Sequence, residues 1–143
     1  MTAQGLEVIE NSGHVAHEWI NELADRLDWS SKRSALRLLR VTLHHVRDHL
    51  VVDELAQMSA QLPVLIRGFF FEGWMPKNTP IKERSADAFI AFISAEMSKT
   101  EEYRGREDIK CVFDVLNNRL SVGEIEDVRA TLPERIRDLW PQP

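Results

Sequence analysis

Cysteine is almost absent from this chain of 143 residues, and its single thiol, Cys111, cannot form a disulfide within the chain. That usage fits a reducing compartment. No run of about 18 apolar residues occurs, so we expect no membrane-spanning helix. The start, Met1 to Glu10, lacks the basic region and long apolar run of a signal peptide. We therefore expect a cytoplasmic protein that does not associate with membranes.

Positive charge is also scarce: 18 Lys and Arg stand against 23 Asp and Glu, a net charge of -5. The chain as a whole should not attract nucleic acid or anionic lipid, which leaves only a local basic patch open. No Gly-rich phosphate loop, Cys-x-x-Cys or His-Glu-x-x-His motif is found. We accordingly expect no catalytic residues, no cofactor and no metal, and favour a protein that is not an enzyme.

Helical periodicity is what the sequence does contain. Apolar residues recur every three or four positions from His14 onward and most clearly between Leu36 and Leu50, whereas strand-type alternation of useful length is missing. A third helix is predicted from Glu54 to Gln61, and Pro63 opens a fourth. Residues 1–12 are interpreted as a loose lead-in or a short helical turn. A linker rich in proline and glycine follows at about 73–81.

The second half of the chain repeats the first at a constant offset of 70 residues. The conserved pairs include Leu50/Leu120, Glu54/Glu124, Leu62/Leu132, Pro63/Pro133 and Arg67/Arg137. A duplicated core should preserve such pairs. The prediction is an all-α fold: a tandem duplication of a four-helix unit, with about eight helices in one compact pseudo-symmetric globule. The units span 1–75 and 76–143, with a single shared domain as the alternative. Each repeated Glu is expected to pair with the repeated Arg of its own half.

An aromatic run marks the fourth helix. Phe69, Phe70 and Phe71 together cover about 200° of a helix surface, so one ordinary core cannot bury all three. Burial between the two halves is the simplest explanation. The alternatives are an interface with a protein partner or a second copy, which would also use Trp74, and a small-molecule pocket.

A basic stripe follows the second helix. Its members are Arg33, Arg37, Arg40, His44 and Arg47, and the second half does not repeat it. Such a row could contact phosphates. A solvated face paired with carboxylates is the plainer interpretation. Nucleic acid is not excluded, but the net charge has the wrong sign for it.

Histidine and cysteine offer little further chemistry. His45 and His49 stand four residues apart, a spacing that metal sites use but that any histidine-bearing helix can show. Cys111 falls on an apolar helix side and is expected to serve packing.

Two signatures carry a family resemblance. The first is the segment Leu36 to Leu50 followed by Leu62-Pro63-x-x-Ile66-Arg67-Gly68-Phe69 and Glu72-Gly73-Trp74. The second is Glu126-Asp127-Val128-Arg129-Ala130-x-Leu132-Pro133 with Leu139-Trp140-Pro141. From about Trp19 to Pro141 the chain resembles a bacterial family of uncharacterised proteins, domain of unknown function 2267. The resemblance implies a helical protein with an internal duplication and no assigned activity.

The leading functional hypothesis is a non-enzymatic interaction or regulatory module that uses Phe69, Phe70, Phe71 and Trp74 toward a protein partner or a second copy. The alternative is an anion- or nucleic-acid-binding protein that uses the basic stripe.

Overall fold

Regular structure is entirely helical over residues 5–143, the part of the chain that the computed structural model describes. In chain order its α-helices are α1 (Glu7–Leu27), α2 (Lys32–Asp48), α3 (Val52–Gln61), α4 (Val64–Phe71), α5 (Ala86–Glu96), α6 (Arg106–Arg119), α7 (Val122–Thr131) and α8 (Glu134–Arg137), with a 3-10 turn η1 (Pro76–Asn78) between α4 and α5. The predicted all-α class is confirmed. None of these helices has the length and apolar character needed to cross a membrane.

Local chemistry accounts for most helix starts. The hydroxyls of Ser31, Ser85 and Ser121 accept the N–H of the third residue onward, which satisfies a donor that the first helical turn leaves free. Pro63 and Pro133 directly precede α4 and α8.

The start of the first helix is the main boundary error. Helix α1 begins at Glu7, within the stretch interpreted as a lead-in, rather than near His14. Glu7 and Glu10 lie in its first turn, where negative charge favours a helix N-terminus. Residues 1–4 of that lead-in lie outside the described part.

Two pairs of equivalent helices occur at matched positions in the two halves. Helices α3 and α7 begin and end 70 residues apart, and α4 and α8 begin 70 residues apart. A repeated contact accompanies them: Arg67 Nη2 donates to the Leu62 carbonyl at 3.0 Å, and Arg137 Nη2 donates to that of Leu132 at 3.1 Å. A duplicated unit would produce these matches; the common origin of the halves stays a prediction.

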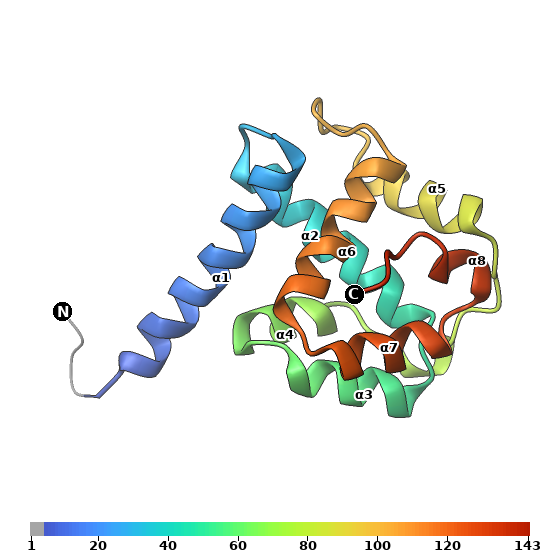
Figure 1. Ribbon diagram of the computed structural model, residues 1–143, viewed down its shortest axis with the longest axis horizontal. Helices are drawn as coiled ribbons and strands as arrows, with labels where there is room; N and C mark the ends of the chain where they lie inside the picture. The colour runs from blue at the N-terminus through green and yellow to red at the C-terminus, as the bar shows by residue number, and fades with distance from the viewer. Residues whose placement is uncertain (1–4) are drawn as a thin grey trace.

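The two halves share one hydrophobic core. Helix α2 packs against α5 and α6, α1 packs against α6, and α3 lies along α7 (Figure 1). The C-terminal segment closes this core, because the buried indole of Trp140 stacks on Phe113 with ring centroids 4.6 Å apart.

The N-terminal turns of α1 project beyond this core (Figure 1). Exposed fractions there are 49% for Leu6, 68% for Val8 and 64% for Ile9, whereas Ala16, Trp19 and Ile20 further along the helix are buried. Helix α1 thus presents apolar side chains that nothing in residues 5–143 covers.

Candidate functional site

The expected ion pairs within each half are wrong. The guanidinium of Arg67 donates to the carbonyls of Ser59 at 2.8 Å and Leu62 at 3.0 Å, at the end of α3. Arg137 repeats only the second of these contacts: its Nη2 donates to the Leu132 carbonyl at 3.1 Å, at the end of α7. The last carbonyl oxygens of a helix have no partner within the helix. A nearby arginine can donate to them, and here it does so instead of pairing with the glutamate of its own half.

The repeated glutamates meet each other instead. Glu54 of α3 and Glu124 of α7 are 7% and 8% exposed and lie close together where the two helices pack. Burial, then the charge of Glu54, raise the pKa of Glu124 to about 7, and Asp127 adds to the effect. Burial likewise raises the pKa of Glu54. A residue that meets its own equivalent is the contact expected on a two-fold axis.

Replacing one member of this carboxyl pair should change the pH dependence of stability. A carboxyl whose pKa is raised on folding contributes stability that is complete below its unfolded pKa and is lost as the pH rises through the folded value. Between about pH 5 and pH 8 the wild type should lose on the order of 1 to 3 kcal/mol that Glu124→Gln does not lose. Urea unfolding at several pH values measures this, with exposed Glu126→Gln as the control. Parallel pH profiles for wild type and Glu124→Gln would contradict a raised pKa of Glu124 in the folded protein.

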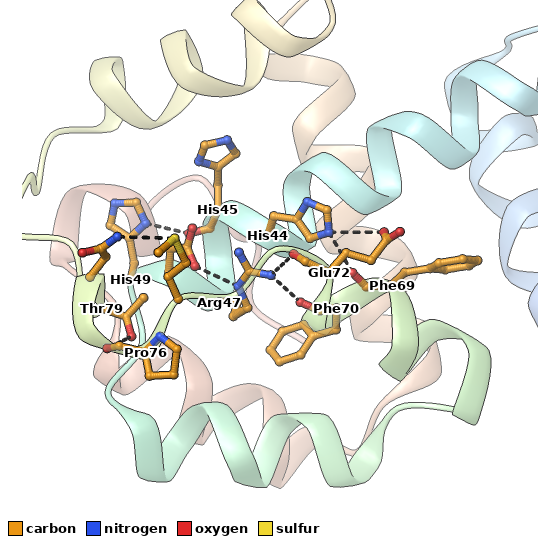
Figure 2. Close-up of polar contacts among 12 residues, drawn as sticks. His44, His45, Arg47, His49, Phe69, Phe70, Glu72, Pro76 and Thr79 are labelled. Carbon is orange, nitrogen blue, oxygen red and sulfur yellow. Dashed lines mark hydrogen bonds and ion pairs between the residues drawn. The ribbon is translucent and has the colours of Figure 1, made fainter.

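Three of the five residues of the basic stripe of α2 make polar contacts within the protein. Figure 2 shows Arg47 directed at the end of α4, where its Nη1 donates to the carbonyls of Phe70 at 2.9 Å and Glu72 at 2.6 Å. Two hydrogen bonds of 2.8 Å join Arg40 to the Glu72 carboxylate. His44 Nε2 lies 2.7 Å from the Phe69 carbonyl oxygen.

These three side chains therefore fasten α4 to α2. Burial lowers the pKa of His44, so this contact is made by a neutral imidazole near pH 7. Only Arg33 and Arg37 of the stripe are exposed and make no hydrogen bond or ion pair with residues 5–143. The anion-contact hypothesis thus retains two of its five residues.

The aromatic run belongs mainly to the core. Phe70 is fully buried, whereas Phe69, Phe71 and Trp74 are partly buried against the core cluster. The exposed apolar side chains lie on either side of the aromatic run: Val64 is 56%, Leu65 42% and Met75 50% exposed. Because it is fully buried, Phe70 can contribute to an interface only indirectly, by holding α4 in place.

The histidines and the cysteine occupy ordinary structural places. The Nε2 atom of His45 lies 2.5 Å from a Glu96 oxygen, and the His45 ring stacks on Phe92. His49 Nδ1 donates to the His45 carbonyl, as Figure 2 shows. Over residues 5–143 no three His, Cys, Asp or Glu side chains are grouped so as to hold a metal ion. Partial burial raises the pKa of the Cys111 thiol, which disfavours the nucleophilic thiolate.

A hollow beside the linker is a feature that the predicted sites do not include. It has a volume of about 900 Å³ and lies between the end of α2, residues 77–84 and the junction of α7 with α8. We call it the linker hollow. Its only signal in the sequence is the group Lys77, Lys82 and Arg84 within a segment that otherwise reads as a spacer.

The fold and these sites define a class: an all-helical protein in which two sets of four helices enclose one core. The profile of the family described as "uncharacterized conserved protein (DUF2267)" matches residues 16–139, and the chain belongs to this family. The resemblance stated from the two sequence signatures is thereby confirmed. No curated protein matches the chain.

Proposed function

We propose that this protein is a non-enzymatic interaction module that binds a protein partner through the projecting turns of α1. The observation that carries the proposal is the continuation of the buried stripe of α1 past the core. Successive helix residues are about 100° apart, so Ile9 lies within about 20° of Ala16 and Ile20 on the helix surface. Those two side chains are buried, whereas Ile9 is 64% exposed.

Helix α4 carries further exposed apolar side chains. It packs against α1, and its first turn carries the exposed side chains of Val64 and Leu65. The partly buried Phe69, Phe71 and Trp74 lie on the same helix or directly after it. Exposed apolar groups on two packed helices are typical of interaction surfaces. In this proposal the aromatic run acts as the rigid base of the interface.

Replacing Ile9 by glutamate should weaken partner binding by more than about tenfold, because a charge would enter the apolar contact. Val122→Glu is the matched control, since Val122 is 55% exposed on the first turn of α7, on another part of the molecule. Light scattering after size exclusion detects a second copy as partner, and a pull-down from the source cell with mass spectrometry detects a different protein.

Both variants should keep the wild-type unfolding midpoint, because neither residue is in the core. A wild type that stays monomeric and captures the same proteins as Ile9→Glu would refute the proposal.

A further inference from the structure

The linker between the halves is fixed over the end of α2. After η1 the chain has no regular secondary structure up to α5, and the N–H of Ile81 donates to the Asp48 carbonyl at 2.7 Å. The linker thereby forms one wall of the linker hollow, and Thr131 and Pro133 from the other half form the opposite wall. Small-molecule sites often lie in such clefts between structural units and measure about 300 to 1000 Å³.

Positive charge is concentrated along this wall. Lys77, Lys82 and Arg84 are exposed and make no side-chain hydrogen bond or ion pair with residues 5–143, and no carboxylate lines the hollow. The neighbouring Glu83 carboxylate accepts the N–H of Ser85 at 2.9 Å. The wall is therefore cationic in a chain whose net charge is -5.

A second hollow shares Arg84 with the linker hollow. It has a volume of about 510 Å³ and adds Arg106 and Arg135, which Asp87 and Asp138 balance. The concentration of positive charge is therefore confined to the linker hollow.

The floor of the linker hollow combines a polar and an apolar element. His49 is 4% exposed; its Nδ1–H donates to the His45 carbonyl, and its Nε2 is a buried atom beside the Glu83 backbone. Val51, Ile81 and Pro133 provide apolar contact beside it.

We propose that the linker hollow binds a small organic phosphate of nucleotide or sugar-phosphate size. Lys77, Lys82 and Arg84 hold the phosphate, because charge-assisted hydrogen bonds from ammonium and guanidinium groups are the strong contacts for phosphate oxygens. The carbon framework packs on Val51, Ile81 and Pro133. Recognition thus has a charged part and a shape-dependent part.

Isothermal titration calorimetry of the full chain tests this site. The probes are inorganic phosphate, ribose 5-phosphate, AMP and a short single-stranded DNA. The double variant Lys82→Gln/Arg84→Gln removes two phosphate contacts, and Arg33→Gln/Arg37→Gln is the matched control with two exposed arginines elsewhere. At least one organic phosphate should bind, about tenfold or more weakly to the linker variant, and within about twofold of wild type to the control. Binding should weaken between about 50 and about 200 mM salt.

Three results would overturn the proposal. The first is the absence of saturable binding by either organic phosphate at millimolar concentration. The second is inorganic phosphate binding as tightly as the organic probes, since the apolar wall would then contribute nothing. The third is single-stranded DNA binding far more tightly than AMP, which would mark a nucleic-acid surface. The Ile9→Glu variant should bind phosphates like the wild type, so that failure here leaves the protein-binding proposal untouched.

Discussion

Replacement of Arg47 by methionine should lower the free energy of unfolding by about 3 to 4 kcal/mol. Arg47 is 3% exposed, and its guanidinium serves the carbonyls of Phe70 and Glu72 and the carboxylate of Asp48. Methionine keeps most of the side-chain volume but removes every donor. Two backbone acceptors at the end of α4 and one partly buried carboxylate then lose their cation, and an unsatisfied buried polar group is expensive.

Urea unfolding followed by circular dichroism measures this loss. The control is Arg37→Met on the same helix, where the exposed side chain makes no such contacts in the described residues and the expected change is below about 0.5 kcal/mol. A loss below about 1 kcal/mol for Arg47→Met would mean that water satisfies the end of α4 as well as the arginine does.

Replacement of Trp140 by alanine should lower the free energy of unfolding by about 3 to 5 kcal/mol. The indole is 1% exposed and stacks on Phe113 with an interplanar angle of 9°, and its Nε1 donates to Asn117 Oδ1 at 2.7 Å. Alanine would leave a large cavity in the shared core and an unpaired amide oxygen on α6.

Trp140→Phe separates these two contributions. Phenylalanine keeps much of the ring stacking but lacks the indole N–H, so the expected loss is only about 1 to 2 kcal/mol. Thermal and urea unfolding of both variants provide the comparison. Equal losses for alanine and phenylalanine would show that the hydrogen bond to Asn117, and not the packing, secures the C-terminal segment.

The helices that the sequence predicts best are those whose signals are local. Leu39 and Leu43 follow the helical period and are fully buried, and Ser121 caps α7 where its Ser-x-x-Glu pattern indicates a helix start. The polar residues near Asn11 led to a predicted helix start that was too late. Helix α1 begins at Glu7, where acidic residues in the first turn favour a helix N-terminus. Helix boundaries are the part of a helix that local sequence signals determine least well.

Contacts between distant segments were harder to predict. Opposite charges favour pairing Glu54 with Arg67, but the meeting of Glu54 with Glu124 depends on how α3 lies on α7. The partners of Arg47 are backbone carbonyls, which every sequence possesses and which therefore leave no pattern to read. The linker hollow likewise has no signature in the sequence beyond its three cations, because its walls come from three separate parts of the chain.

The carboxyl pair makes the packing of α3 on α7 sensitive to pH. While Glu124 keeps its proton, the pair carries at most one negative charge. In alkaline solution both become charged, Asp127 adds a third negative charge close by, and no arginine or lysine makes an ion pair with any of them in residues 5–143. Repulsion then acts between α3 and α7, and because the two halves share one core, base should destabilise the whole molecule through this contact.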